Sequence, residues 1–363
     1  MIISRTPFRI SFFGGGTDYP VWYKKHGGSV LCTTIDKYCY ITCRALPPFF
    51  EHKFRAVYSK IELCQSFEEV QHPAVRETVR FLKIKRGMEI HHDGDLPARS
   101  GMGSSSSFTV GLLHSLYAWQ GMMVSKMRLA RESIHIEQNM IGETVGSQDQ
   151  VAVAFGGLNR VVFHRNGEIE VQPLTISNAR QDELCSHLML FYTGIKRTAA
   201  EVADSYVSCL LDRKKTLLQM KDLVDEGAMI LNSRAPISRF GELLHRGWLL
   251  ERGLSSQVSN STIDTLYEKA RRNGAIGGKI TGAGGGGFLL LFVPPAAQKN
   301  VRSGLRELIH VPIKLESEGS RIIFFDTNEE DFSQAIHDRE QREIGAFIEM
   351  KAKHPKRHHT KPD

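Results

Sequence analysis

The first half of the chain alternates strand-like and helical runs, which predicts a sheet with helices between its strands. The strand-like runs are residues 2–12, 28–46 and 88–92, and the second of them is interpreted as a pair of strands. The runs with helical spacing of apolar residues are 72–86, 105–120 and the segment that Ser125 caps. This order of elements predicts an α+β domain.

The second half also alternates strand-like and helical runs. The composition changes at residues 177–183, where we place a domain boundary. Just before it, residues 157–175 read as a hairpin with its turn at Asn166-Gly167. The predicted strands beyond the boundary are 188–193, 288–293, 311–315 and 322–325. The predicted helices are 198–231, 240–252, 262–273 and 296–308. Two domains of this size each suffice to bury a core.

Two acidic residues on predicted helices of the first half are candidate functional residues. Glu137 lies near the end of the helix that Ser125 begins. Asp149 follows Ser147, and the sequence Ser147-Gln148-Asp149-Gln150 fits a capping box in which Gln150 reaches back to Ser147. From the residues alone, Glu137 is either functional or a solvated helix-face acid, and Asp149 is either functional or a dipole-stabilising acid.

Three glycine-rich stretches interrupt the pattern, and we interpret all three as parts of one ligand cleft. They are Gly14-Gly15-Gly16 followed by Thr17-Asp18, then Leu96–Ser107, then residues 277–287. In the second stretch, glycines let backbone approach a ligand closely and serines begin a helix whose N-terminal N–H groups attract phosphate. It is neither a Walker A loop nor a dinucleotide fingerprint. The alternatives left open are a glycine turn, an ordinary serine-capped helix and a mobile hairpin loop, respectively.

Composition narrows the class of protein. The chain has 363 residues with 41% hydrophobic and 24% charged residues, as in a globular protein, and its longest apolar run, 288–293, is too short to cross a bilayer. Its net charge is +7, but residues 351–363 carry five basic residues and one acidic residue, which leaves +3 elsewhere. We therefore expect no nucleic-acid partner and no membrane partner.

Cysteine usage and the first residues add expectations about location. None of the six cysteines forms a Cys-x-x-Cys pair, so neither a disulfide nor a zinc site is expected. The first residues lack a signal-peptide pattern, which favours a cytoplasmic location.

Three segments together resemble the signature motifs of the GHMP superfamily, which comprises galactokinase, homoserine kinase, mevalonate kinase and phosphomevalonate kinase. They are Pro7–Asp18, Leu96–Ser107 and Lys279–Phe288, and their order and spacing fit over about residues 2–330. The resemblance implies an α+β GHMP kinase fold. Residues 1–180 would form a domain like the second domain of ribosomal protein S5, 181–340 a ferredoxin-like domain, and 341–363 a disordered basic tail.

Within the superfamily the chain looks most like the bacterial D-glycero-D-manno-heptose 7-phosphate kinases, which share the Gly-Gly-Gly-Thr-Asp form of the first motif. Galactokinases have a Glu-His pair where this chain has Gly15-Gly16, which disfavours that assignment. The resemblance implies phosphorylation of the anomeric hydroxyl by ATP, giving a 1,7-bisphosphate for surface polysaccharide such as lipopolysaccharide. Alternatives are a fucokinase or another sugar-1-kinase, a related decarboxylase and a ligand-sensing protein without activity.

The resemblance also implies roles for single residues. Glu137 and Asp149 are twelve positions apart, the spacing of a metal-binding glutamate and a catalytic aspartate in galactokinase-type members. Asp149 would therefore accept or orient the proton of the substrate hydroxyl, with Arg9 beside it. Glu137 and a hydroxyl of Ser104 or Ser105 would hold Mg²⁺, which prefers oxygen ligands.

The remaining implied residues form two sets. Those expected to bind ATP are Pro97, Arg99, Gly101, Met102, Gly103, Ser104, Ser105 and Ser106. Those expected to bind the sugar phosphate are Gly15, Gly16, Thr17, Asp18, Lys196, Arg197, Thr281, Gly282, Ala283 and Gly284. Lys196, Arg197 and Arg99 are the candidates for a second phosphate on the substrate. A homodimer and a role for the basic tail are left open.

Overall fold

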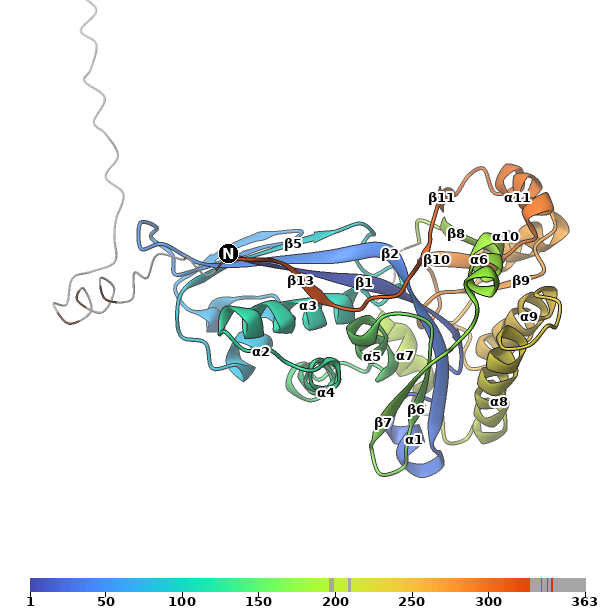
Figure 1. The fold of residues 1–363 in the computed structure, drawn as a ribbon, viewed down its shortest axis with the longest axis horizontal. Helices are drawn as coiled ribbons and strands as arrows, with labels where there is room; N and C mark the ends of the chain where they lie inside the picture. The colour runs from blue at the N-terminus through green and yellow to red at the C-terminus, as the bar shows by residue number, and fades with distance from the viewer. Residues whose placement is uncertain (196–198, 208–209, 327–333, 335–337, 339–340, 342–363) are drawn as a thin grey trace, which may run out of the picture.

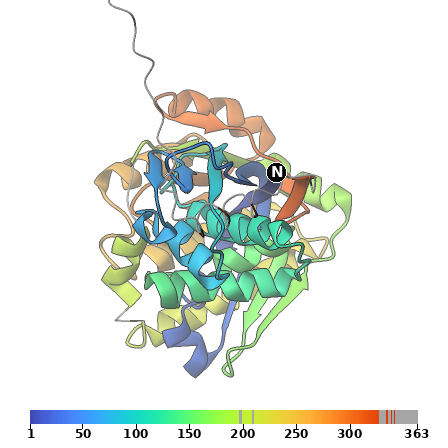
Figure 2. The ribbon, with the colours of Figure 1, turned by 90° about the vertical axis from the view of Figure 1, so that its left-hand side faces the viewer.

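The computed structural model describes residues 1–195, 199–207, 210–326, 334, 338 and 341. Within them the chain forms an α+β fold with two sheets (Figure 1). Helices α2 to α5 lie on one side of the larger sheet, and most of the second half forms a body at one end of it. Turned by 90°, the teal and green helices lie in the middle of the view, below the blue strands near the N-terminus (Figure 2).

The larger sheet contains nine of the described strands, with the order β13-β1-β2-β5-β3-β4 along its main path. The path strands are Arg321–Phe325, Ile2–Phe13, Gly28–Ala45, Met88–Gly94, Phe54–Val57 and Ile61–Cys64, in that spatial order. Strands β6 (Asn159–Phe163) and β12 (Leu315–Glu316) also pair with β2, and β7 (Ile169–Pro173) pairs with β6. The predicted hairpin at Asn166-Gly167 is therefore confirmed as the β6–β7 pair.

Within residues 28–46 the chain forms one long strand, Gly28–Ala45, so the prediction of two paired strands is wrong. The first part of β2 pairs with β6 and the later part pairs with β5. The register against β1 jumps from Pro7–Tyr38 to Phe8–Ile35. Asp36 therefore lies in a bulge, where its N–H donates to the Lys314 carbonyl oxygen, and not in a hairpin turn.

The helices of the first half are α1 (Pro20–His26), α2 (Pro73–Phe81), α3 (Ser104–Trp119), α4 (Lys126–His135) and α5 (Gln148–Phe155). Of these, α3 and α5 pack against β1 and β2, and α2 and α4 pack against α3. Helix α3 is buried on most of its sides, and Gly111 lets it approach β1 so closely that a Cβ there would lie 2.9 Å from Thr6 Oγ1. This close packing fixes the position of the helix N-terminus at Ser104.

The helix that Ser125 caps does not continue regularly through Glu137. Ser125 accepts a hydrogen bond from Arg128 N–H, as expected of an N-cap. After His135 the chain widens into a π-helix over Ile136–Ile141, which ends at Gly142 with φ 79°. Such segments are frequent at functional sites, and this one turns Glu137 into the interior.

The smaller sheet has the order β11-β8-β10-β9 and is antiparallel throughout. Its strands are β8 (Leu188–Tyr192), β9 (Gly277–Ile280), β10 (Phe288–Phe292) and β11 (Ile309–Val311). Its helices are α6 (Asn178–His187), α7 (Ala199–Val207), α8 (Lys214–Leu231), α9 (Ser238–Arg252), α10 (Ser261–Arg272) and α11 (Gln298–Gly304). The single helix predicted over 198–231 is thus two helices.

The last strands return to the larger sheet. Residues 322–325 were expected to complete the second half, but β13 pairs with β1 and β12 with β2. The two halves also share apolar contacts, since Phe13 and Phe240 lie with ring centroids 5.2 Å apart. The proposed division into residues 1–180 and 181–340 remains a prediction, and nearly all of the tail, 341–363, lies outside the described residues. None of the described helices is long and apolar enough to span a membrane.

Candidate functional site

A cavity of about 250 Å³ lies where the two halves meet, and residues of all three glycine-rich stretches line it. The first half contributes the end of β1, the turn after it, the segment 99–106 (the serine loop), the loop 143–146 and the start of α5. The second half contributes residues of α7, α9, β9 and the loop after β9. The interpretation of one cleft assembled from both halves is therefore supported by the geometry.

The serine loop directs the N-terminus of α3 at this cavity. Gly101 and Gly103 have φ of 78° and 75°, a conformation that glycine adopts at little cost. Ser104, Ser105 and Ser106 follow as the first turn of α3 and line the cavity. Because they belong to the first turn of the helix, their backbone N–H groups have no carbonyl acceptor within it. This helix end can therefore bind an anionic oxygen.

Three of the predicted ATP-binding residues differ in their position relative to the cavity. Arg99 lines the cavity, with φ 58°. Met102 is completely buried under the loop, so a direct contact of its side chain with a ligand is excluded by this conformation. Pro97 lies outside the cavity lining, and its carbonyl oxygen accepts a hydrogen bond of 2.6 Å from Ser100 Oγ.

The glycine-rich loop after β9 packs backbone against backbone on the serine loop. A Cβ at Gly101 would collide with the Thr281 carbonyl oxygen, and one at Gly287 would collide with that of Ser100. Gly282 and Ala283 line the cavity, whereas Thr281 is buried behind it and Gly284 faces Val258. The glycines are therefore explained by close approach of two loops, in place of a free hairpin.

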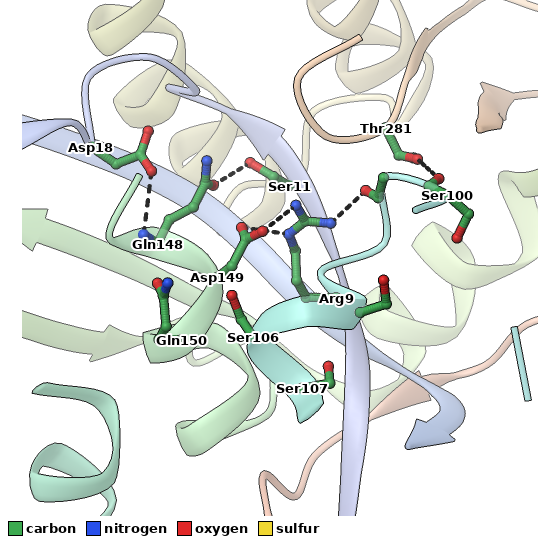
Figure 3. A network of polar contacts seen from close by, with 12 residues as sticks. Arg9, Ser11, Asp18, Ser100, Ser106, Ser107, Gln148, Asp149, Gln150 and Thr281 are labelled. Carbon is green, nitrogen blue, oxygen red and sulfur yellow. Dashed lines mark hydrogen bonds and ion pairs between the residues drawn. The ribbon is translucent and has the colours of Figure 1, made fainter. Parts of the chain in front are cut away.

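Arg9 and Asp149 form the polar centre of the cavity (Figure 3). Arg9 Nε donates to Asp149 Oδ1 at 2.7 Å and Nη2 donates to Oδ2 at 2.6 Å, so the pair is bidentate. Nη1 donates to the Gly101 carbonyl oxygen at 2.6 Å. The arginine is 3% exposed, whereas 24% of the Asp149 side chain is exposed toward the cavity. Arg9 thus ties Asp149 to the serine loop.

Asp18 holds the start of α5 from outside the helix. Its carboxylate accepts hydrogen bonds from Gly16 N–H at 3.0 Å and from Gln148 N–H at 3.2 Å (Figure 3). The capping box predicted for Ser147 and Gln150 is wrong, because Ser147 makes no side-chain cap and the Gln150 amide turns to Glu137. Complete burial and the nearby Asp149 charge raise the pKa of Asp18 from 3.8 to about 6.

Glu137 is fully buried and lines the cavity beside Ser106 at the start of α3. Its Oε2 accepts hydrogen bonds from Gln150 Nε2 at 2.5 Å and Ser106 Oγ at 3.1 Å. Its Oε1 has no partner among the described residues, and burial raises the pKa of this carboxyl to about 7. The serine bonded to Glu137 is therefore Ser106, while the predicted Ser104 and Ser105 line the same cavity.

These oxygens suit a magnesium ion. No cluster of three or more His, Cys, Asp or Glu side chains occurs among the described residues, which excludes a preformed cage of such ligands there. Mg²⁺ is commonly held by one or two carboxylates together with substrate phosphates, and Glu137 offers a buried oxygen without a partner. The residues present fit that mode.

Only some of the predicted sugar-binding residues line the cavity in the structure. Gly15, Gly16 and Asp18 line the cavity. Thr17 does not line the cavity: it is buried, and its hydroxyl donates to the carbonyl oxygens of Gly14 and Ser29. Lys196 and Arg197 lie outside the described residues.

Several lining residues were not predicted from the sequence. Gln148, Tyr206, Glu251 and Lys279 all contribute to the cavity wall. Lys279 lies within the third glycine stretch and Gln148 directly precedes Asp149, so their positions in or beside motifs were an available signal. Glu251 belongs to the amphipathic pattern of α9, and only the tertiary structure distinguishes it from a surface acid.

Comparisons with known proteins agree with this geometry. The family model for the N-terminal domain of GHMP kinases matches residues 70–157, and that for the GHMP kinase C-terminal domain matches residues 233–310. The D-glycero-alpha-D-manno-heptose 7-phosphate kinase of Campylobacter jejuni is 29% identical over 324 residues, which cover 84% of this chain and 93% of that protein. The bifunctional fucokinase/GDP-fucose pyrophosphorylase of Arabidopsis thaliana is 27% identical over 236 residues, 63% of this chain and 22% of that protein.

A solved structure has the same fold. The D-glycero-D-manno-heptose 1-phosphate kinase from Bacteroides thetaiotaomicron superposes with a TM-score of 0.74 at 22% identity. The superposition covers 90% of this chain and 100% of that one.

Proposed function

The chain belongs to the GHMP kinases, ATP-dependent phosphotransferases with an alcohol group as acceptor, and on that premise we propose that its acceptor is D-glycero-D-manno-heptose 7-phosphate. The γ-phosphoryl group would pass to the anomeric hydroxyl, giving the 1,7-bisphosphate. The observation that carries the proposal is the bidentate Arg9–Asp149 pair, which faces the cavity beside the first turn of α3. The similarity to the Campylobacter jejuni heptose 7-phosphate kinase supports the choice of sugar.

The nucleotide phosphates are assigned to the serine loop. The N–H groups of Ser104, Ser105 and Ser106 offer donors at the positive end of α3, a helix of 16 residues. Gly101 and Gly103 keep the loop free of side chains where phosphate oxygens approach. Binding there would place the γ-phosphate toward Asp149, across the same cavity.

Asp149 is assigned to the acceptor hydroxyl. The hydroxyl oxygen forms a bond to the γ-phosphorus while the bond between that phosphorus and the bridging oxygen breaks, and ADP leaves. The hydroxyl proton passes to the Asp149 carboxylate and from there to solvent. Arg9 holds the carboxylate in one orientation through two hydrogen bonds, so its remaining lone pairs stay directed into the cavity.

Glu137 and the serine hydroxyls are assigned to the metal. When bound, Mg²⁺ would neutralise charge on the phosphate oxygens. Glu137 offers Oε1, which has no partner among the described residues. Gln150 and Ser106 hold its other carboxylate oxygen and thereby fix the direction of Oε1.

A second candidate is a sugar without a phosphate, as in a fucokinase. Among the described lining residues, five carboxylates face three cations: Asp18, Glu137, Glu143, Asp149 and Glu251 against Arg9, Arg99 and Lys279. Arg9 and Lys279 are each engaged in an ion pair. A phosphate at the far end of the acceptor thus depends on Arg99 or on cations beyond the described part of the cavity wall, whereas a neutral sugar needs neither.

A coupled ADP-release assay over a panel of acceptors tests the proposal. The panel contains the heptose 7-phosphate, fucose, galactose and mevalonate, with buffer alone as the blank. The proposal predicts that the heptose 7-phosphate gives the highest kcat/KM. Release with fucose and none with the heptose phosphate would move the assignment to a fucokinase, and no acceptor-dependent release would favour a ligand-sensing protein.

A further inference from the structure

The part of the cavity wall that the second half of the chain supplies contains an ion pair that the mechanism above does not use. Lys279 Nζ lies 2.5 Å from Glu251 Oε1, and the two side chains are 3% and 12% exposed. Lys279 comes from β9 and Glu251 from the last turns of α9, and both line the cavity. The charges are thus held at the edge of the ligand space by two separate elements.

Stability alone does not account for such a pair. Two buried charges lose their hydration, and well-packed apolar residues of similar volume are often as stable or more so. An ammonium offers three donors, and one acceptor, Glu251 Oε1, is found for Lys279 in the described structure. The pair therefore retains donor and acceptor capacity for a ligand.

Gly15 gives an independent sign that a ligand occupies the space beside Glu251. Its neighbours Gly14 and Gly16 have φ of 87° and 90°, which explains them by backbone conformation. Gly15 has no such φ, and a Cβ there would meet only Glu251 Oε1 at 3.7 Å and Gln148 Nε2 at 4.0 Å. Neither the backbone nor packing requires a glycine here, so the missing side chain leaves room between these two polar groups.

Gln148 completes the set of polar groups around this space. Its Oε1 accepts a hydrogen bond of 2.6 Å from Ser11 Oγ, which leaves the Nε2 amide group as a donor at the cavity wall. Gln148 directly precedes the proposed base Asp149 at the start of α5, and both residues line the same cavity. Carboxylate acceptor, ammonium donor and amide donor together match vicinal hydroxyl groups.

Resting on the proposed sugar-kinase function, we propose that Glu251, Lys279 and Gln148 bind the ring hydroxyl groups of the acceptor in the space that Gly15 leaves open. The Lys279–Glu251 pair is neutral overall, and the Glu251 carboxylate would repel a phosphate. The acceptor therefore lies with its neutral hydroxyl-bearing ring against this pair, and any phosphate it carries points elsewhere. The three side chains determine which sugar stereochemistry is accepted.

Four variants separate binding from folding. Glu251→Gln keeps shape and removes charge, and Gly15→Ser fills the space without backbone strain. The double variant Glu251→Leu/Lys279→Met replaces the pair by apolar side chains. Glu226→Gln is the matched control, because Glu226 of α8 pairs with Arg246 of α9 on the exposed surface, where the two side chains are 39% and 59% exposed.

The measurements are KM for acceptor and for ATP, kcat, and thermal unfolding of each full-length variant. We expect acceptor KM to rise about 10-fold or more in the first three variants, as for loss of a charged hydrogen bond, with ATP KM within about 2-fold of wild type. Glu226→Gln should change neither. A deoxy analogue of the acceptor that lacks the hydroxyl bound by Glu251 should lose affinity with wild type and lose little more with Glu251→Gln.

The outcomes distinguish the two proposals. If wild type phosphorylates no sugar of the panel, the proposed function fails and this inference with it. If wild type phosphorylates a sugar while the folded double variant and Gly15→Ser keep the wild-type acceptor KM, the function stands and the inference is overturned.

Discussion

Arg9 and Asp149, 140 residues apart in the sequence, meet through two parallel hydrogen bonds of 2.6 and 2.7 Å in the cavity between the halves of the chain. Strand β1 supplies the guanidinium and the second residue of α5 supplies the carboxylate. A third N–H of Arg9 reaches the carbonyl oxygen of Gly101. One buried side chain thus couples the position of the proposed base to that of the serine loop.

Asp149→Asn should lower kcat by at least ~10², because the amide cannot take the proton of the acceptor hydroxyl. The KM for ATP should change little, since the serine loop is untouched. Steady-state kinetics with saturating acceptor measure both values. Turnover within a few-fold of wild type would remove Asp149 from the role of base.

Arg9→Lys should also lower kcat, by roughly 10-fold or more, because lysine keeps the charge but loses the two-pronged geometry. In a double-mutant cycle with Asp149→Asn the two losses should be far from additive, since the residues act as one unit. The quantity to determine is kcat/KM for the acceptor in the four proteins of the cycle. Additive losses would show that Arg9 acts on the substrate independently of Asp149.

Asp18→Asn should change the pH dependence of stability. The pKa of Asp18 is raised from 3.8 to about 6 by burial, so between these values the folded chain holds a proton that the unfolded chain has lost. The free energy of unfolding of wild type therefore falls as pH rises through this window, by about 2 kcal/mol between about pH 4.5 and 7.5 from this group. Urea unfolding at both pH values should show that the variant lacks this component. An identical pH dependence in both proteins would mean that Asp18 is not buried as described.

Gly101→Ala should weaken ATP binding and stability together. A Cβ at Gly101 strains a backbone with φ 78° and collides with the Thr281 carbonyl oxygen of the neighbouring loop. Gly121 is the matched control, because its φ is 71° and a Cβ there meets nothing within 4 Å. We expect Gly121→Ala to lower the free energy of unfolding by about 1 kcal/mol, and Gly101→Ala to lower it by at least ~2 kcal/mol more. Gly101→Ala should also raise the KM for ATP. Equal losses in both variants would argue against the close packing of the two loops.

Glu137→Gln should raise the Mg²⁺ concentration at which activity is half-maximal. The amide offers one oxygen without charge where the carboxylate offered two, and Mg²⁺ favours carboxylate. A titration of kcat against free Mg²⁺ at fixed ATP measures the effect. The same half-maximal concentration in both proteins would leave Glu137 a structural acid beside Gln150 and Ser106.

The sequence predicted the parts of the site that depend on local backbone. The glycines at 101 and 103 and the serines after them mark a loop that begins a helix, and a short-range pattern suffices to recognise it. Arg9 and Asp149 were named from the family resemblance, and their contact follows from the fold. Glu137 was placed on a regular helix, because nothing in its spacing signals a π-helix.

The features that were missed depend on pairing over long distances. The single strand β2 was predicted as a pair of strands from its local residues alone, whereas a bulge against β1 absorbs Asp36 and Lys37 within one strand. The capping box at Ser147 was plausible locally, but the carboxylate of Asp18, 130 residues away, holds the Gln148 N–H. Glu251 and Lys279 meet only because α9 and β9 lie side by side, so no local pattern connects them.

The most direct test of the central claim is phosphorus NMR of a reaction containing the protein, ATP, Mg²⁺ and D-glycero-D-manno-heptose 7-phosphate. The account predicts ADP and, in equal amount, a new phosphate monoester coupled to the anomeric proton, with both absent from the Asp149→Asn reaction over the same period. Formation of ADP and inorganic phosphate without a sugar bisphosphate would contradict it.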